Sequence, residues 1–328
     1  MPSKGGFAQH AQSGEIPEKR LMGITVIICT HNRANLLRRT LAFLNQARRP
    51  ATCQVEILVI ANACTDDSAA LLDNYIEQAA ERDWLPLRWQ EEWVVGKSNA
   101  LNHAISLVRT PVIAMVDDDH RVDEGYLLAI CQASKQYRDA SIFCGRILPD
   151  WTGEEPAWIH DEGQFAIYPL PVPRYENGGS PCTVGCDGPI PGGGNLFLRR
   201  AIFDRVGKFN TALGPKGHNL SGGEDMDFVL RALKAGERLQ YVPDVLQYHV
   251  VEVNRLKLGY IMRKSFSRSQ APILVKIHSS QFPPRYLWGK LVSYFLHVLT
   301  SLYWPETRFY LIRTSAALGE LVAYVRRF

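Results

Sequence analysis

The sequence VIAMVDDDHRV, residues 112–122, joins an apolar run to three consecutive carboxylates. The apolar part, residues 112–116, predicts a buried strand. Asp117, Asp118 and Asp119 follow it directly, although adjacent like charges repel each other and a carboxylate is costly to remove from water. Two interpretations are open: the turn after the strand is exposed to water, or a cation binds there.

The chain before this stretch repeats one pattern, in which a strand, a polar loop and a helix follow one another. Strands are expected at residues 24–29, 55–60 and 87–92, and helices at residues 36–47, 68–81 and 96–108. Asn35 is expected to cap the first of these helices, and Asp67 or Ser68 the second. This alternation predicts an α/β fold with a mostly parallel central sheet and helices on both faces.

Polar loops follow three of the predicted strands. Their sequences are THNRAN at residues 30–35, NACTDD at 62–67 and DDD at 117–119. Ligands of open parallel sheets bind beyond the carboxyl ends of the strands. We therefore expect a binding site where these three loops meet.

The second half of the chain is less regular in pattern. Residues 150–195 are rich in Pro and Gly, which predicts loops lying over the sheet. Residues 224–236, EDMDFVLRALKAG, predict an amphipathic helix that ends at Gly236. Residues 239–251, LQYVPDVLQYHVV, predict either a pair of strands or a strand and a turn.

Charge is unevenly distributed along the 328 residues. From Val251 onward there are twelve Lys and Arg against three acids, a net charge of +9; since the whole chain carries +4, the first 250 residues carry −5. The basic C-terminal part is therefore expected to face an anionic surface, either a membrane or a phosphate-rich substrate. Residues 1–20 lack the apolar run of a signal peptide and are expected to form a disordered tail.

The seven cysteines are scattered, and only Cys182 and Cys186 lie close together in sequence. Two cysteines with no nearby His or Cys give little indication of a zinc site. Cys29 and Cys131 lie in apolar runs and are expected to be buried thiols. We expect a reducing compartment.

The carboxylates suit the chemistry of Mg²⁺ or Mn²⁺, which bind carboxylate oxygens and leave room for substrate phosphates. Such an ion neutralises the charge that develops on a departing nucleoside diphosphate. A second acidic cluster, Glu224, Asp225 and Asp227, begins the predicted helix at 224–236. It either complements the helix dipole or supplies a general base that deprotonates an alcohol.

Two further residues have both a structural and a functional interpretation. His249 follows an apolar segment and is either a structural histidine or a ligand. Lys97 begins a predicted helix after Gly96, where anions bind, and is either a phosphate contact or a surface lysine.

Six segments, taken together and in order, resemble the family-two nucleotide-sugar glycosyltransferases of the GT-A fold. They are ITVIICTHNRANLLRRTL, ILVIANACTDDS, GKSNALNHAI, PVIAMVDDD, GGGNLFLRRAIFDRVGKFN and GGEDMDFVLRALKAGERLQYVPDVLQYH. The resemblance runs from about Ile24 to about Ser269. The segments EPAWI and VVEVNRLKLGYIMRKSFSRSQ also resemble, more loosely, a bacterial subgroup that makes surface or exported polysaccharide.

The resemblance implies roles for the acidic residues and for one histidine. Asp225 is expected to be the catalytic base of an inverting transfer, with Glu224 supporting it or contacting the acceptor. Asp119 and His249 are expected to bind Mn²⁺ or Mg²⁺. Asp117 is expected to contact the ribose or the donor sugar.

The remaining expected site residues contact the donor. Thr30 and Asn62 are expected to line the nucleobase pocket, and Lys97 to lie by the nucleotide. Expected under the donor sugar are Gly193, Gly194 and Asn195. Asp118 is expected to be a further contact of the nucleotide or donor. Many relatives have an acidic pair where this chain has Ala61 and Asn62. A carboxylate only accepts hydrogen bonds whereas Asn also donates, so guanosine and thymidine stay open beside uridine.

We therefore expect a GT-A catalytic domain over residues 21–250 and a basic, amphipathic helical extension over residues 251–328. The expected activity is metal-dependent transfer of a sugar from a nucleoside-diphosphate-sugar to a saccharide or lipid-linked acceptor, in polysaccharide or glycolipid synthesis. No nucleic-acid partner is expected. We expect a cytoplasmic protein whose C-terminal helices either lie on the inner face of the cell membrane or pack on the catalytic domain.

Three other classes of protein remain as alternatives. A sugar nucleotidyltransferase normally has a Gly-rich phosphate loop after its first strand, and a dinucleotide-dependent oxidoreductase has G-x-G-x-x-G there. The loop THNRAN at residues 30–35 contains no glycine. A non-catalytic sugar- or lipid-binding homologue is expected to lack one acidic cluster, whereas this chain has both.

Overall fold

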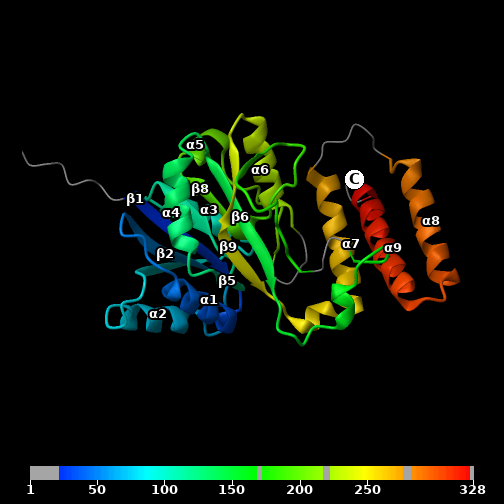
Figure 1. Cartoon of the computed structure of the whole chain (residues 1–328), viewed down its shortest axis with the longest axis horizontal. Helices are drawn as coiled ribbons and strands as arrows, with labels where there is room; N and C mark the ends of the chain where they lie inside the picture. The colour runs from blue at the N-terminus through cyan, green and yellow to red at the C-terminus, as the bar shows by residue number, and fades with distance from the viewer. Residues whose placement is uncertain (1–21, 168–171, 217–221, 276–281, 326–328) are drawn as a thin grey trace, which may run out of the picture.

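The computed structural model describes residues 22–167, 172–216, 222–275 and 282–325 (Figure 1). The tail expected over residues 1–20 lies outside them. Within the described residues the strands are β1 Met22–Thr30, β2 Cys53–Asn62, β3 Leu87–Glu92, β4 Val112–Met115, β5 His120–Val122, β6 Ile142–Asp150, β7 Cys182–Val184, β8 Leu196–Arg199 and β9 Leu239–Val250. The α-helices are α1 Ala34–Gln46, α2 Ser68–Ala79, α3 Lys97–Leu107, α4 Tyr126–Gln136, α5 Ile202–Val206, α6 Glu224–Lys234, α7 Leu258–Val275, α8 Arg285–Thr300 and α9 Trp304–Val325. Short 3₁₀ turns are η1 Ala157–His160, η2 Gly193–Asn195 and η3 Val253–Leu256.

All the strands of the described residues join one sheet, in the order β3-β2-β1-β4-β8-β6-β9-β5, with β7 paired to β9. Strands β1 to β4 pair in parallel, as do β6 and β9. Strand β8 pairs antiparallel with both β4 and β6, and β9 pairs antiparallel with β5 and β7. The α/β fold is confirmed, and the sheet is parallel in its N-terminal half and mixed beyond it.

Both faces of the sheet are covered because its strands alternate apolar side chains between them. In β1, Ile24, Val26 and Ile28 face one core, which is completed by α1, α2 and α4. Ile27 faces the other core, which is completed by α3, α5 and α6. The prediction of helices on both faces is confirmed.

The starts of the first two helices differ from the sequence-based expectation. Asn35 lies within α1, which begins at Ala34, so its prediction as a cap is wrong. Asp67 occupies the cap position of α2 but makes no capping hydrogen bond. Asp66 performs this task for both helices: its Oδ2 accepts from Ala34 N at 2.9 Å and its Oδ1 from Ser68 N at 3.2 Å. One carboxylate therefore ties the loop after β1 to the loop after β2.

The prediction of a free, buried thiol at Cys131 is wrong, because Cys131 forms a disulfide with Cys53. The two lie 78 residues apart in sequence, so no local spacing indicated the pair. Packing of α4 on the core beside β2 brings them together. Cys29 is a free cysteine, and burial raises the pKa of its thiol to about 12.

Strand β9 is a single strand of 12 residues, where the sequence left a strand pair open. Its pairing with β6 shifts register between Cys144 and Arg146, which accommodates Pro243 in mid-strand. The described residues between 150 and 195 form mostly loops, as predicted, interrupted by η1, the short strand β7 and η2. Strand β9 carries His249 to the same end of the sheet as the acidic triplet.

The C-terminal helices form a separate layer beside the sheet, which confirms the helical C-terminal region. Figure 1 shows α7 nearest the sheet, α9 next to it and α8 outermost. Helices α7 and α9 pack closely at Gly319, where a Cβ would lie 2.1 Å from Phe266 O. In the described part of the chain, no helix is both long and apolar enough to cross a membrane. The division of the chain at residue 250 stays a prediction.

Candidate active site

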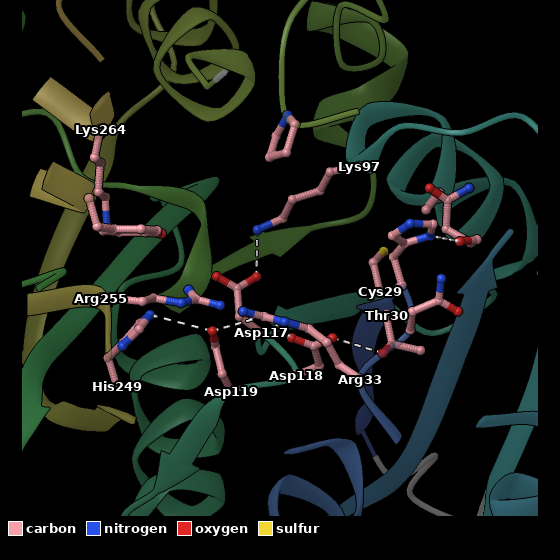
Figure 2. A pocket seen from close by; sticks show the side chains of 16 residues that line it. Cys29, Thr30, Arg33, Lys97, Asp117, Asp118, Asp119, His249, Arg255 and Lys264 are labelled. Carbon is pink, nitrogen blue, oxygen red and sulfur yellow. Dashed lines mark hydrogen bonds and ion pairs between the residues drawn. The ribbon is translucent and has the colours of Figure 1, made fainter. Parts of the chain in front are cut away.

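A cavity of about 610 Å³ opens where the first strands of the sheet end (Figure 2). Thr30 and Asn62 end β1 and β2, and the acidic triplet lies between β4 and β5. In Figure 2, His249, Arg255 and Lys264 lie on the opposite side of the carboxylates from Thr30 and Cys29. The predicted meeting of three strand-end loops is therefore observed.

The acidic triplet is largely buried, so the interpretation as a wet turn is wrong for two of its members. Asp118 and Asp119 are only 4% and 5% exposed. Asp118 accepts from Thr30 Oγ1 and from Arg33 Nη1, each at 2.7 Å. The same Arg33 atom donates to Asp119 Oδ2 at 2.9 Å, and Lys97 Nζ donates to Asp117 Oδ1 at 2.5 Å. Two basic side chains thus offset the charge of three carboxylates.

Burial and neighbouring charges shift the pKa values of the three carboxylates in different directions. Burial and the neighbouring Asp119 raise the pKa of Asp118 to about 6. Burial also acts to raise the pKa of Asp119. The attraction of His249, which is protonated at the low pH where Asp119 titrates, and of Arg33 outweighs it and holds this pKa well below its usual range. Lys97 similarly lowers the pKa of Asp117 against the effect of burial. Asp117 and Asp119 therefore stay ionised near neutral pH.

Asn62 lines the cavity, but hydrogen bonds within the protein use both ends of its side chain. Its Nδ2 donates to Glu92 O at 2.9 Å and to Val94 O at 2.8 Å, and its Oδ1 accepts from Gly96 N at 2.8 Å. These bonds hold the loop that leads into α3. Recognition of a nucleobase by Asn62 stays a prediction.

Glu224 and Asp225 begin α6, whose first turn follows Gly223 in a left-handed conformation. Asp225 Oδ2 accepts from Gly193 N at 2.6 Å. Burial and the adjacent Asp225 raise the pKa of Glu224 to about 7, and its Oε2 has no hydrogen-bond partner among the described residues. Burial acts to lower the pKa of Lys97, but the attraction of Asp117, Glu224 and Asp225 outweighs it and holds this pKa above its usual range.

The glycine-rich segment Gly193–Asn195 separates the two acidic clusters. A Cβ on Gly193 would lie 3.1 Å from Asp225 Cβ, and one on Gly194 would lie 2.8 Å from Asp117 Oδ2 and 2.7 Å from His120 Cε1. The approach at Gly194 excludes a side chain unless its neighbours move, and the approach at Gly193 leaves little room for one. Asn195 is buried, and its Nδ2 donates to the carbonyls of Arg146 and Val245. The structure therefore brings Gly193 and Gly194 to the carboxylates, whereas the side chain of Asn195 bonds backbone carbonyls instead.

One group of side chains can hold a metal ion. A ligand atom from each of Asp119, His120 and His249 lies within 4.8 Å of the other two. His249 Nε2 is 3.6 Å from Asp119 Oδ2, and burial lowers the pKa of His249 to about 4, so its imidazole is neutral. Neutral imidazole and carboxylate are ligands that a divalent ion accepts. The residues present therefore fit a divalent metal.

Sequence reasoning missed several residues of this site. They are Arg33, His120, Arg255, Tyr260 and Lys264. Arg33 lies in a loop whose polarity was noticed, but nothing in the sequence indicated that it binds the triplet. Tyr260 and Lys264 belong to α7, in the region that we assigned to a separate extension. Burial and the neighbouring Arg255 lower the pKa of Lys264 to about 8.

Comparison with known proteins supports one family. The sequence profile described as glycosyl transferase family 2 matches residues 25–207. A glucosyl-dolichyl phosphate glucuronosyltransferase of Haloferax volcanii is 22% identical over 75% of this chain and 74% of its own. The succinoglycan biosynthesis protein ExoM of Rhizobium meliloti is also 22% identical, over 75% of this chain and 73% of its own.

Solved structures show the same fold at low identity. The mannosyltransferase PcManGT of Pyrobaculum calidifontis, solved with GDP-Man and Mn²⁺, superimposes with a TM-score of 0.57 at 16% identity. The match covers 93% of this chain and 86% of that one. Residues 1–349 of S. aureus TarS, solved with UDP-GlcNAc, give a TM-score of 0.53 at 13% identity over 93% of this chain and 91% of that one. The fold is therefore GT-A.

Proposed function

The chain belongs to glycosyl transferase family 2, and from that premise we propose that it transfers a sugar from a nucleoside-diphosphate-sugar to a hydroxyl acceptor with inversion. The observation that carries the proposal is the meeting of two acidic clusters across Gly193 and Gly194. Asp225 lies against the first glycine and Asp117 against the second. One cluster can therefore act on an acceptor while the other holds the donor.

Asp225 is proposed as the base of this transfer. It takes the proton of the acceptor hydroxyl while the hydroxyl oxygen bonds to the anomeric carbon, and the bond from that carbon to the diphosphate oxygen breaks. Attack from the side opposite the leaving group inverts the carbon. The hydrogen bond from Gly193 N fixes the direction in which Asp225 points.

Basic side chains support a diphosphate leaving group. Arg33, Lys97, Arg255 and Lys264 all line the cavity around the carboxylates. We propose that Lys97 faces the nucleotide, with Thr30, Asn62, Asp117 and Asp118 as further donor contacts. The donors named in the solved neighbours, GDP-Man and UDP-GlcNAc, support a nucleotide-sugar of this kind.

We propose that Asp119 and His249 hold Mn²⁺ or Mg²⁺. When bound, such an ion would neutralise charge on the diphosphate, as in other transfers from phosphate esters. The fit of the donor set supports this, as does the Mn²⁺ named with PcManGT.

A nucleotide screen tests the proposal. The full-length protein is heated with UDP, GDP or TDP, each with and without Mn²⁺, and release of the same nucleotide from its sugar conjugate is then measured. A specific nucleotide at a hundredfold excess over its Kd should stabilise the protein by about 2.7 kcal/mol, and only with metal. Its sugar conjugate should lose sugar to acceptor or water. If no nucleotide stabilises the protein and no conjugate is consumed, the proposed function is wrong.

We further propose a saccharide or lipid-linked acceptor, and a location on the cytoplasmic face of the cell membrane. Outward-facing apolar side chains on α8 support this location: Trp288, Val292, Phe295 and Leu299 recur at helical spacing and are all more than half exposed. We call these four residues the outer face of α8. An amphipathic helix with such a face binds in the plane of a bilayer.

Charge favours an anionic lipid surface as the partner of this face over a second copy of the chain. The region from Val251 onward carries +9. Two of its three acids are engaged in ion pairs, Glu252 with Arg33 and Arg255 and Glu320 with Lys290, and Glu306 lies 3.7 Å from His297. Two copies joined through this region would bring like charges together, whereas anionic headgroups attract them.

Vesicle flotation tests the location. The full-length protein should float with phosphatidylglycerol vesicles at low salt, stay behind with phosphatidylcholine vesicles, and be released by high salt. Light scattering should report a monomer without vesicles. A dimer that ignores anionic vesicles would show that a second copy covers the outer face of α8 and would overturn the membrane location.

A further inference from the structure

The inference begins with two buried amides behind the cavity, whose orientation the backbone fixes. Asn195 Nδ2 lies 2.9 Å from each of two carbonyl oxygens, those of Arg146 and Val245. Carbonyl oxygens only accept hydrogen bonds, so the amide nitrogen must face them. Asn195 Oδ1 therefore faces the other way and accepts.

Gln247 is oriented in turn by this oxygen. Its Nε2 lies 3.0 Å from Asn195 Oδ1, 3.2 Å from the carbonyl of Met115 and 2.8 Å from Tyr126 Oη. Two of these partners, the Met115 carbonyl and Asn195 Oδ1, can only accept hydrogen bonds here. The amide nitrogen of Gln247, and not its oxygen, therefore faces them. Gln247 Oε1 then faces His120 Nδ1 at 2.5 Å and must accept from it.

His120 therefore carries a proton on Nδ1. In a neutral imidazole only one ring nitrogen is protonated, so Nε2 presents a lone pair. His249 has the same form for a separate reason: its Nδ1 lies 2.8 Å from the carbonyl of Val250, which only accepts. In the neutral form of each ring, both histidines thus present an unprotonated Nε2.

The two lone pairs point at carboxylate oxygens. His120 Nε2 lies 4.0 Å from Asp119 Oδ1 and 4.0 Å from Asp117 Oδ2, and His249 Nε2 lies 3.6 Å from Asp119 Oδ2. When both rings are neutral, neither contact contains a proton that could be shared. Electron-rich atoms that converge in this way repel one another unless a cation lies between them.

Close packing keeps His120 in this position. Its side chain is buried, and its ring lies against Gly194, where a Cβ would approach Cε1 to 2.7 Å. The rings of His120 and His249 meet edge to face with centroids 5.0 Å apart. A ligand atom of each ring already lies within 4.8 Å of the other and of an Asp119 oxygen.

We infer that His120 binds the divalent cation together with Asp119 and His249, and that this donor set selects Mn²⁺ over Mg²⁺. Imidazole nitrogen suits first-row transition ions, whereas Mg²⁺ prefers oxygen ligands and retains its waters. Gln247 acts as a positioning residue because it fixes the tautomer of His120. Only the use of this ion in sugar transfer rests on the proposed function.

Two measurements on the unaltered protein test the inference without nucleotide or sugar. Two-bond ¹⁵N–¹H correlation on the metal-free, histidine-labelled chain should show His120 protonated at Nδ1 and bare at Nε2. Electron spin-echo modulation of the Mn²⁺-loaded protein should show two coupled imidazole nitrogens. A proton on Nε2 of His120, or a single coupled imidazole, would overturn the assignment.

A metal-binding titration tests the preference for Mn²⁺ over Mg²⁺ and compares the wild-type protein with a variant of His120. The wild-type protein should bind Mn²⁺ at least about tenfold more tightly than Mg²⁺. His120→Asn keeps an N–H near the position of Nδ1 for Gln247 but removes Nε2, and should weaken Mn²⁺ binding about 10–100-fold. His160→Asn, at an exposed histidine outside the cavity, should change nothing. Equal affinities for the two ions, or unchanged Mn²⁺ binding by His120→Asn, would refute the inference while leaving sugar transfer untouched.

Discussion

The carboxyl edge of the sheet buries charge, whereas the outer face of α8 exposes apolar side chains. Asp118 and Asp119 are 4% and 5% exposed, but Phe295 and Leu299 are 53% and 65% exposed. Each region reverses the usual distribution of residues in a folded protein. The difference between them lies in how the chain itself compensates for the reversal.

At the sheet edge the protein supplies its own compensation through Arg33 and Lys97. Those contacts fix the carboxylates before any ligand binds, which suits a small ion or nucleotide that needs exact geometry. On α8, the described residues offer nothing that covers the outer face. A broad, deformable partner such as a lipid surface suits it because apolar burial has no directional requirement.

The largest effect is expected from Asp225, at the sheet edge. Asp225→Asn can still accept the hydrogen bond from Gly193 but cannot take a proton, so transfer should fall about 10²–10⁴-fold while nucleotide binding persists. Steady-state rates and nucleotide affinity check this. Asp227→Asn, in the same helical turn but paired with Arg231, is the control and should retain most activity. A near wild-type rate for Asp225→Asn would move the role elsewhere, first to Glu224.

The next largest effect is expected on stability, when the positive charge of Arg33 beside the buried carboxylates is removed. Arg33→Met leaves Asp118 and Asp119 without their shared partner and should lower the free energy of unfolding by about 3 kcal/mol. Arg49→Met removes an exposed pair with Asp83 and should lower it by about 1 kcal/mol at most. Urea unfolding of metal-free protein at neutral pH measures both. Equal losses would show that Arg33 does not compensate the buried charge.

The pH dependence of stability should show a smaller effect of buried charge. The pKa of Glu224 rises from 4.5 to about 7 on folding, so the folded state binds its proton more tightly than the unfolded state. Glu224 therefore destabilises the protein above about pH 7, and this effect disappears as the pH falls toward 4.5. Glu224→Gln should gain about 2–3 kcal/mol over wild type at pH 8 relative to pH 5.

Comparison of wild type with the variant is needed because Asp118, with its pKa raised to about 6, contributes a dependence of the same sign. Unfolding at several pH values gives the difference directly. Parallel curves for wild type and Glu224→Gln would contradict the raised pKa of Glu224.

The smallest effect on stability is expected on α8, where the comparison is sharpest. Trp288→Ala, Phe295→Ala and Leu299→Ala should each change the free energy of unfolding by under about 0.5 kcal/mol, because their side chains are exposed. Each should nevertheless weaken binding to anionic vesicles about 10–100-fold, since about 1.5–3 kcal/mol of apolar burial is lost.

Leu287→Ala provides the matched control on the buried face of the same helix. Leu287 is 1% exposed and packs against Leu321 and Tyr324, so this change should lower stability by about 2–5 kcal/mol. If substitutions on the outer face were as destabilising as Leu287→Ala, that face would be part of the protein core and would be unable to bind vesicles.

Much of the fold followed from local pattern. The strand expected at residues 87–92 is β3 with the same bounds, and the acid-led helix at 224–236 is α6, which ends two residues earlier. Periodicity is a property of neighbouring residues, so it can be read without knowing the tertiary structure. The helix starts were predicted less well because Asp66, the residue that caps both helices, bonds Ala34 across 32 positions of sequence.

The candidate site was predicted in outline through its acidic residues and the resemblance they carried. The basic residues of the site were not predicted. Arg33 lies in a loop and Lys264 on α7, and only the tertiary structure brings them into one cavity with the carboxylates. The same holds for His120, whose tautomer depends on Gln247, 127 residues away. Cys131 shows the same limit, since its partner Cys53 is distant in sequence.

The sequence by itself determined the α/β order of elements, the two acidic clusters and the basic C-terminal region, because composition and periodicity are local. Only the tertiary structure decided which charges are buried, which partner offsets each of them, and which side of α8 faces outward. Burial, hydrogen-bond direction and the pKa of a side chain depend on groups that the fold brings within a few ångströms. Those groups come from segments that the linear order keeps far apart.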